Sequence, residues 1–345
     1  MHTNAAATTK RTSGSDSSLI VGVDLGGTNT VVGAMTSDGK HQYGMRSFLT
    51  RADLGADAVV ARITENVEDA IRVTREQTGR GRADFAGVGI GSPGPLNRES
   101  GIVIFTPNLG WRDFPLRDRI QDAVQLPATL DNDANCATLG EWWLGAARGA
   151  RNVVGFTLGT GIGGGLILNG RLYHGASDMA GELGHTTIDT NGRRCGCGNY
   201  GCLEAYASGP AIAERARESL AGGEASMMPS MVEGELSRLT AALVYAAAAK
   251  GDELAIEVVR DTARFLGTGI ANLLNIFNPE VVVLAGGVAL AGEALFEPLR
   301  AEVRRRAFKP AVDVCRIVPG QLDGTAGVVG AVATFKQQNE ENELT

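Results

Sequence analysis

The stretch from residue 19 to residue 35 reads LIVGVDLGGTNTVVGAM, and it decides the fold. Apolar residues lead to Asp24 and the turn Gly26-Gly27-Thr28, and β-branched residues resume directly after this turn. The pattern predicts a strand, a tight turn and a second strand. A dinucleotide-binding fingerprint would need a helix after the glycines, and residues 30–33 (TVVG) are a poor helix start. We therefore expect a β-hairpin. Its backbone N–H groups could hold an anion, with Asp24 placed to bind hydrated Mg²⁺, or the segment could be a plain turn without a ligand.

A second glycine-rich hairpin is predicted in the other half of the chain. Residues 153–158 read as a strand, and the sequence GTGIGGG at residues 159–165 leads into another strand that ends at residue 168. Five glycines in seven positions are costly unless the backbone must approach a ligand closely. The two hairpins indicate an internal duplication, in which each of two domains supplies one phosphate-holding turn beside a shared cleft.

Strands and helices alternate along the rest of the chain, which predicts an α/β architecture. The expected helices span residues 55–78, 115–124, 208–220, 236–250, 252–277 and 289–307, and a terminal helix reaches residue 337. The expected strands span residues 85–90, 102–105, 127–131, 280–285 and 312–318. Residues 221–235 are predicted to form a mobile loop, and the acidic tail beyond residue 337 is predicted to fray.

Composition excludes several classes of protein. A length of 345 residues suits two domains, and a net charge of −7 argues against nucleic acid or an anionic membrane as the main partner. No apolar run reaches the roughly 18 residues that a membrane span needs. Residues 1–18 are polar and predict a disordered tail rather than a signal peptide. We therefore expect a cytoplasmic protein.

Acidic and amide side chains cluster in the sequence DNDAN at residues 131–135, just before a helix-like segment. One such residue suffices to cap a helix, and four are present. A carboxylate here could accept the proton of an attacking hydroxyl group while an asparagine fixes the substrate. The helix N-terminus would favour the ionised carboxylate.

Three of the five cysteines lie within eight positions, at Cys195, Cys197 and Cys202, and His185 precedes them. A Cys₃His set matches tetrahedral zinc, and four protein ligands leave no open position, so the predicted metal is structural. Free buried thiols or a redox pair are the alternatives. Glu182 and Glu204 flank this loop, where they could accept hydrogen bonds from the hydroxyl groups of a ligand or could be solvated at the surface. The remaining cysteines, Cys136 and Cys315, are predicted to be small core residues. His2, His41 and His174 have no evident partner.

The motifs together resemble the ROK family (repressor, open reading frame, kinase), and within it the bacterial glucokinases. The resemblance extends from residue 20 to about residue 335. The motifs that carry it are VDLGGTN, GSPGP, TPNLGW, DNDANCA, TLGTGIGGGL, GELGH, CGCGNYGCLEAYASG and VLAGGV.

This resemblance implies an actin-like, hexokinase-like (ribonuclease H-like) fold with two α/β domains around a cleft. The small domain would span residues 19–129 and be joined by the returning C-terminal helix at residues 325–337. The large domain would span residues 130–324 and carry the zinc loop at residues 185–204.

The resemblance also assigns roles to individual residues. Asp133 corresponds to the family's catalytic base. The implied sugar contacts are Asn108, Asn132, Asp133, Glu182, His185 and Glu204, and His185 would also bind zinc with Cys195, Cys197 and Cys202. The implied nucleotide contacts are Asp24, Gly26, Gly27, Thr28, Thr160, Gly161, Gly286 and Gly287.

The activity implied is ATP-dependent phosphorylation of glucose at the 6-hydroxyl, with Mg²⁺ and structural Zn²⁺ as cofactors and a homodimer as the assembly. Mannose, fructose, N-acetylmannosamine or N-acetylglucosamine are alternative acceptors, and polyphosphate is an alternative donor. A non-catalytic sugar-sensing regulator is the alternative outside enzymes. Family repressors carry an N-terminal helix-turn-helix, for which the residues before the first strand are too few.

Overall fold

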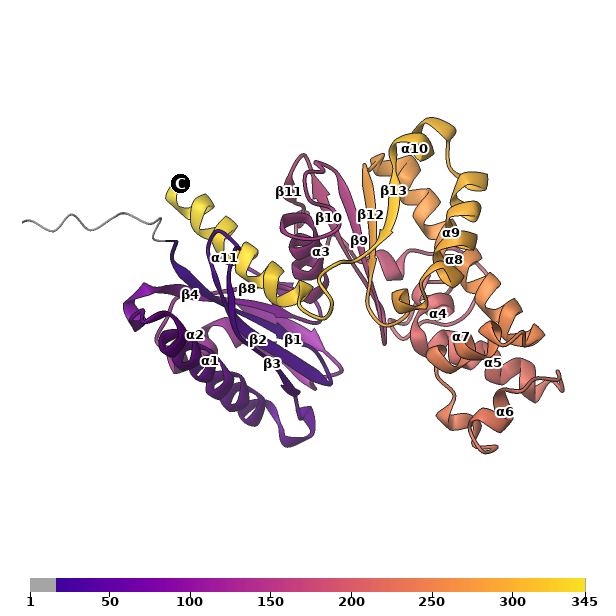
Figure 1. Cartoon of the computed structure of the whole chain (residues 1–345), viewed down its shortest axis with the longest axis horizontal. Helices are drawn as coiled ribbons and strands as arrows, with labels where there is room; N and C mark the ends of the chain where they lie inside the picture. Colours follow the sequence, from indigo (N-terminus) through magenta and orange to yellow (C-terminus); the bar gives the residue numbers. More distant parts are fainter. Residues whose placement is uncertain (1–16, 345) are drawn as a thin grey trace, which may run out of the picture.

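A computed structural model describes residues 17–344, and two five-stranded sheets dominate it (Figure 1). The first sheet has the order β3-β2-β1-β4-β8, in which β1, β2 and β3 are antiparallel and β4 and β8 run parallel to β1. Its strands are β1 (Leu19–Leu25), β2 (Asn29–Thr36), β3 (Gln42–Leu49), β4 (Phe85–Ser92) and β8 (Ala128–Asn132). The predicted hairpin at Gly26 is therefore confirmed.

The second sheet repeats this plan in the order β11-β10-β9-β12-β13. Strand β9 pairs antiparallel with β10 and parallel with β12, as β1 does with β2 and β4. The strands are β9 (Val153–Leu158), β10 (Ile162–Leu168), β11 (Arg171–Leu172), β12 (Val281–Ala285) and β13 (Arg316–Pro319). A small third sheet joins β5 (Leu96–Asn97), β6 (Ile102–Thr106) and β7 (Trp111–Phe114).

Helices cover both sheets and bury two large apolar cores. On the first sheet, α1 (Ala56–Thr78) and α2 (Leu116–Val124) share a core with β1 and β4. The second core lies under the helices that follow β10 in sequence, grouped at the far end of the molecule from α1 (Figure 1). These are α4 (Glu204–Ala207), α5 (Gly209–Ala221), α6 (Met228–Met231), α7 (Ala241–Ala249), α8 (Glu253–Phe277) and α9 (Glu293–Arg306).

The last helix, α11 (Ala326–Leu344), returns from the second half of the chain and packs against β1 and β4 (Figure 1). It also packs along α3 (Asp133–Trp143), the helix that follows β8. The backbones come so close that a Cβ at Gly89 would lie 1.9 Å from the carbonyl oxygen of Ala331, and one at Gly330 would lie 1.6 Å from that of Cys136. Glycine at these positions lets α11 lock β4 and α3 together.

Several predicted boundaries are wrong. The strand expected at residues 312–318 begins only at Arg316, because Pro310 starts a helix, α10 (Lys309–Val314). The helix expected at residues 289–307 is interrupted at Gly292, where φ is +60°. The helix expected from residue 236 begins as α7 after its cap, Thr240.

The ends and the predicted loop also differ. The loop at residues 221–235 contains α6 and is anchored by the buried side chains of Met228 and Val232. Helix α11 runs to Leu344, past the predicted end at residue 337. Residues 1–16 of the predicted tail lie outside the described residues, whereas the Ser17 carbonyl accepts a hydrogen bond from Arg80. Within the described part, no helix is long and apolar enough to cross a membrane.

Candidate active site

The DNDAN segment lies where β8 ends and α3 begins. The side chain of Asn132 caps α3, because its Oδ1 accepts from the backbone N–H groups of Ala134 at 2.9 Å and Asn135 at 3.1 Å. Asp133 is the first helical residue, and its Oδ1 accepts from the N–H of Ala134 at 2.8 Å. The cap fixes the turn, so the Asp133 carboxyl has a defined direction.

Burial raises the pKa of Asp133 to about 6, and the nearby charge of Glu182 acts in the same direction. A carboxyl with this pKa is mostly ionised at neutral pH and is a stronger base than an ordinary aspartate. This combination suits a residue that accepts a proton from a hydroxyl group during reaction.

Asp24, at the end of β1, faces the same region. Burial raises its pKa to about 7, and the charge of Asp133 adds to this effect. Helix α11 approaches Asp24 closely, since a Cβ at Gly327 would lie 2.2 Å from its Oδ2. Two carboxyl groups that disfavour each other's charge fit a divalent cation, which would stabilise the ionised form of both. The oxygen ligands therefore suit hydrated Mg²⁺.

The predicted phosphate turns are tight and well braced. In the first, the N–H of Gly26 donates to the carbonyl of Asn29 at 3.0 Å, and the hydroxyl of Thr50 donates to the Gly26 carbonyl at 2.7 Å. The side chain of Asn108 packs against this turn, since a Cβ at Gly27 would lie 3.1 Å from the Cβ of Asn108. No sequence motif pointed to the buried Thr50, which comes from the loop after β3.

The second turn lies beside the first turn of α3, because a Cβ at Gly163 would lie 2.7 Å from the Cβ of Ala134. The N–H of Gly159 donates to the carbonyl of Gly161 at 3.0 Å. Glu204 braces the turn, since its Oε2 accepts from the N–H of Ile162 at 2.9 Å. Gly161 leaves the room for this contact, because a Cβ there would lie 2.5 Å from the same oxygen.

Glu182, His185 and Glu204 form a second group of polar side chains, of which Glu204 also contacts the second phosphate turn. Burial raises the pKa of Glu182, the charge of His185 lowers it, and the charge of Glu204 raises it. Nε2 of His185 lies 4.0 Å from Oε2 of Glu182. Carboxylates and an imidazole nitrogen that are partly exposed suit the hydroxyl groups of a sugar.

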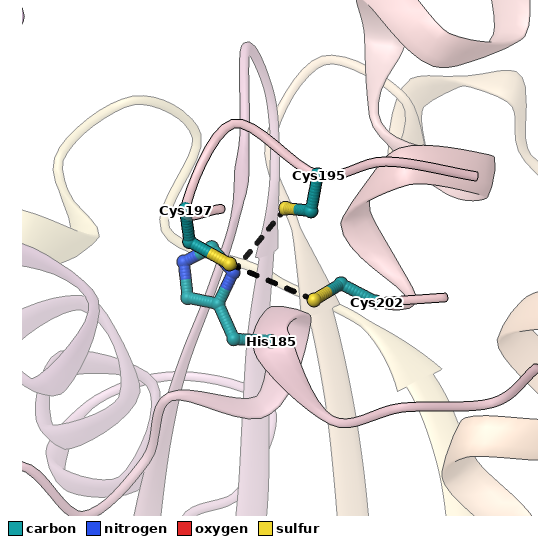
Figure 2. A group of neighbouring side chains, drawn as sticks. All are labelled: His185, Cys195, Cys197 and Cys202. Atoms are coloured by element: carbon teal, nitrogen blue, oxygen red, sulfur yellow. Dashed lines mark hydrogen bonds between the residues drawn. The ribbon is translucent and has the colours of Figure 1, made fainter. Parts of the chain in front are cut away.

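The other face of His185 belongs to a metal-binding set (Figure 2). The ligand atoms of His185, Cys195, Cys197 and Cys202 all lie within 4.8 Å of one another. The Sγ of Cys195 is 3.7 Å from Nδ1 of His185, and the sulfurs of Cys197 and Cys202 are 3.7 Å apart. Zinc–sulfur bonds of about 2.3 Å on a tetrahedron place sulfurs about 3.8 Å apart. The donor set therefore fits a structural zinc ion, bound by Nδ1 while Nε2 faces Glu182.

A cavity of about 450 Å³ lies beyond the second phosphate turn. Its lining residues are Gly159, Thr160, Gly209, Pro210, Ala213, Arg217, Leu239, Thr240, Ala241, Ala242, Gly287 and Val288. A mostly apolar cavity next to a glycine turn suits a nucleoside attached to phosphates. Thr160 and Gly287 of the predicted nucleotide contacts line it, whereas Gly286 turns the chain behind it with φ at +92°. The residues from α5 and α7 were not found from sequence.

Not every cluster residue faces the site. Asp131 is buried and its carboxylate is paired with the side chains of Arg98 and His174. The expectation that His174 has no partner is therefore wrong. Its partner lies 43 positions away, beyond the reach of any local pattern. Cys136 is buried in the core as predicted, whereas Cys315 is only half-buried.

The family to which the chain belongs follows from its relatives. A sequence profile of the ROK family matches residues 20–338, and the chain belongs to that family. The glucokinase of Halalkalibacterium halodurans is 39% identical over 94% of this chain and 96% of its own length. The glucokinase of Thermotoga maritima is 38% identical over 92% of this chain and 98% of its own length. A putative xylose repressor of Caldicellulosiruptor is 35% identical over 91% of this chain and 77% of its own length.

Solved structures share the fold. The ROK hexokinase of Thermus thermophilus superposes with a TM-score of 0.77 at 34% identity, covering 93% of this chain and 99% of that one. A ROK glucokinase of Streptomyces griseus, in complex with glucose and AMPPNP, has a TM-score of 0.78 at 34% identity and covers 92% and 98% of the two chains. The family resemblance and the actin-like fold inferred from the sequence are confirmed.

Proposed function

We propose that this protein is a sugar kinase that transfers the γ-phosphoryl group of ATP to the 6-hydroxyl of glucose, with Asp133 as the general base. The observation that carries the proposal is the environment of Asp133. This carboxyl has a pKa of about 6, its charge acts on Asp24 just before the first glycine turn, and its neighbour Ala134 packs against the second glycine turn, which borders the cavity. Relatives named glucokinase, which match nearly the whole chain, support the same activity.

The nucleotide would occupy the cavity beside Thr160 and Gly287, with its phosphates directed along the two glycine turns. The backbone N–H groups near Gly26, Gly27, Thr28 and Gly161 would hold the phosphate oxygens. A hydrated Mg²⁺ beside Asp24 would neutralise charge on the transferred group. The neighbouring zinc set supplies no open position for substrate, so its role would be to order the loop that carries Cys195 and Glu204.

The sugar would lie between Asp133 and the side chains of Glu182, His185 and Glu204, with Asn108 and Asn132 as further contacts. Asp133 accepts the proton of the 6-hydroxyl while that oxygen attacks the γ-phosphorus and the bond to ADP breaks. Most of the acceleration comes from holding the two reactants in line and from the fixed charges and N–H groups around the phosphate.

Two alternatives bear on this proposal. The partly exposed carboxylates of Glu182 and Glu204 would also accept hydroxyl groups of mannose or another hexose, which changes the acceptor and leaves the mechanism intact. A sugar-sensing regulator is the second alternative, because xylose repressors are among the relatives. The raised pKa values of Asp133 and Asp24 favour catalysis over sensing. The homodimer and the cytoplasmic location expected from the sequence stay predictions.

The variant Asp133→Asn tests the general base. It keeps the size and the hydrogen-bonding oxygen of the side chain, and it cannot accept the proton. We expect turnover to fall about 10²–10⁴-fold while glucose still binds in a calorimetric titration. Asp122→Asn, at an exposed position on α2, is the matched control and should keep full turnover. Near-normal turnover of Asp133→Asn would show that Asp133 is not the general base.

A further inference from the structure

Asp131 has a carboxylate that is fully enclosed, with polar partners on both of its oxygens, and the proposed mechanism does not use it. Its side chain is 0% exposed. Oδ1 accepts from the N–H of Asn132 at 2.8 Å and from Nδ2 of Asn135 at 3.1 Å. Oδ2 lies 2.8 Å from Nε2 of His174 and 3.1 Å from Nε of Arg98. An ionised carboxylate only accepts hydrogen bonds, so Nε2 of His174 donates to it, whereas Arg98 forms an ion pair with it.

The partners of Asp131 come from two distant segments. Arg98 lies in the turn between β5 and β6, in the small third sheet. His174 follows β11 in the second half of the chain. It lies near the start of the segment of residues 173–185, which we call the sugar loop because Glu182 and His185 lie near its end. Asp178 of the sugar loop is also tied to Arg98, because its Oδ2 accepts from the Arg98 backbone N–H at 3.0 Å.

The sugar loop is held against α3 at its other end as well. Asn135, which donates to Asp131, lies in the first turn of α3. A Cβ at Gly181 would lie 3.4 Å from Oδ1 of Asn135, so the residue just before Glu182 packs on the same side chain. Asp131 is therefore bonded to the catalytic turn on one oxygen and to the start of the sugar loop on the other.

Two opposing effects act on the pKa of Asp131. Burial works against ionisation of Asp131, yet His174 and Arg98 hold its pKa below the usual value. A buried charge of this kind is stable only while its partners stay in place. Removing one partner leaves the carboxylate with an unmet hydrogen-bonding position, and the segments that it joins must then shift.

We propose that His174 and Arg98 are positioning residues, which act through Asp131 to hold the sugar loop in register with Asn132 and Asp133. The inference rests on the proposed function, because it makes Glu182 and Asp133 the two groups whose separation matters. Neither His174 nor Arg98 touches the reacting atoms. A misplacement of about 1 Å between such groups costs on the order of 100-fold in rate.

The variant pair His174→Leu and His174→Gln tests this role. Leucine removes the donor, whereas the amide nitrogen of glutamine can reach the place of Nε2. We expect His174→Leu to lower kcat about 100-fold and to raise the KM for the sugar, while the KM for ATP stays within about twofold. His174→Gln should recover at least tenfold of the lost kcat. His41→Leu, at a surface histidine that stacks on Tyr43, is the matched control and should behave as the wild type.

A purely structural role would look different. In that case the folded fraction of His174→Leu would keep the wild-type kcat and both KM values, and only its Tm would fall. That result, or a loss of kcat that His174→Gln does not reduce, would overturn the proposal. Arg98→Gln provides the same test if His174→Leu fails to fold, because the Arg98 side chain is 20% exposed and its removal is less disruptive.

Amide hydrogen exchange separates this inference from the proposed function, because it needs no kinase activity. In His174→Leu we expect faster exchange in residues 173–185 and 131–135 and unchanged exchange in α8. If the wild type phosphorylates no sugar yet the variant shows this pattern, the proposed function fails and the coupling of the two segments stands. Unchanged exchange in both segments would contradict the coupling itself.

Discussion

Oε2 of Glu204 accepts a hydrogen bond from the backbone N–H of Ile162 at 2.9 Å, which joins the zinc loop to the second phosphate turn. Oε1 of the same carboxylate lies 3.7 Å from the sulfur of Cys195. One side chain thus contacts a phosphate turn and the metal-binding set, and it lies near Glu182 on the proposed sugar side. The sugar side and the nucleotide side of the site are mechanically connected through Glu204.

This connection predicts that Glu204→Ala impairs both substrates. The variant loses the acceptor for Ile162 as well as a sugar contact, so the KM values for glucose and for ATP should both rise, and kcat/KM should fall about 10–100-fold. Steady-state kinetics with each substrate varied in turn would measure this. Glu257→Ala, at an exposed position on α8, is the control. A rise in the sugar KM alone would mean that the contact with Ile162 has no role in nucleotide binding.

Zinc should be bound as a single ion for each chain, and it should stabilise the protein. Cys197→Ser removes a ligand at an exposed position, so elemental analysis should show loss of zinc and a thermal scan should show a lower Tm. Cys315→Ser, outside the metal-binding set, should keep both zinc and Tm. If Cys197→Ser retained stoichiometric zinc with an unchanged Tm, the four residues would not be the ligands.

The pKa of Asp133 predicts how activity depends on pH. The base must be ionised, and its pKa is raised to about 6. At saturating Mg-ATP, where the cation favours the ionised carboxylate, the acid limb of kcat/KM for the sugar should lie at or below pH 6, and kcat/KM should fall about tenfold for each further unit. A pH–rate profile between pH 4.5 and 8 would measure this limb. A rate that does not change between pH 4.5 and 8 would show that the reaction does not need the ionised carboxylate of Asp133.

Replacing Asp24 with a neutral residue should stabilise the folded protein and reduce its activity. Its pKa is about 7 in the folded protein and 3.8 as the ordinary value, so the stability that its protonated form contributes is present below pH 4 and is lost as the pH rises through 7. At pH 8 the neutral variant Asp24→Asn should raise the free energy of unfolding by on the order of 2 kcal/mol.

The same Asp24 variant should lose turnover, because a neutral amide holds Mg²⁺ and its phosphates weakly. Denaturant unfolding at pH 4 and pH 8 would measure the stability, and the gain should vanish at pH 4. An equal gain at both pH values would show that the effect is packing against Gly327 and not the charge of Asp24.

The sequence predicted those parts of the fold that depend on neighbouring residues. Both glycine hairpins followed from a turn flanked by β-branched residues, and the zinc set from ligands within 18 positions, from His185 to Cys202. Misplaced boundaries arose where a local signal was overridden, as at Pro310, which lies in the first turn of a helix that includes residues 312–314 of the predicted strand.

The candidate site was predictable in its motifs and not in its long-range supports. Thr50 holds the first phosphate turn from across a loop, and His174 meets Asp131 from 43 positions away. Such contacts depend on how the two sheets and α11 pack. The residue pattern of a single segment cannot predict this packing. The assignment of individual sugar and nucleotide contacts stays a prediction that rests on the family resemblance.

The central claim is tested most directly by ADP release from Mg-ATP in a coupled assay, with zinc-loaded protein, a panel of hexoses and a no-sugar control. We predict strong turnover with glucose and weak turnover with fructose, N-acetylglucosamine and N-acetylmannosamine. Turnover with a different hexose would keep the kinase and change its acceptor. No turnover with any sugar, with ATP or with polyphosphate as donor, would contradict the account and favour a sugar-sensing regulator.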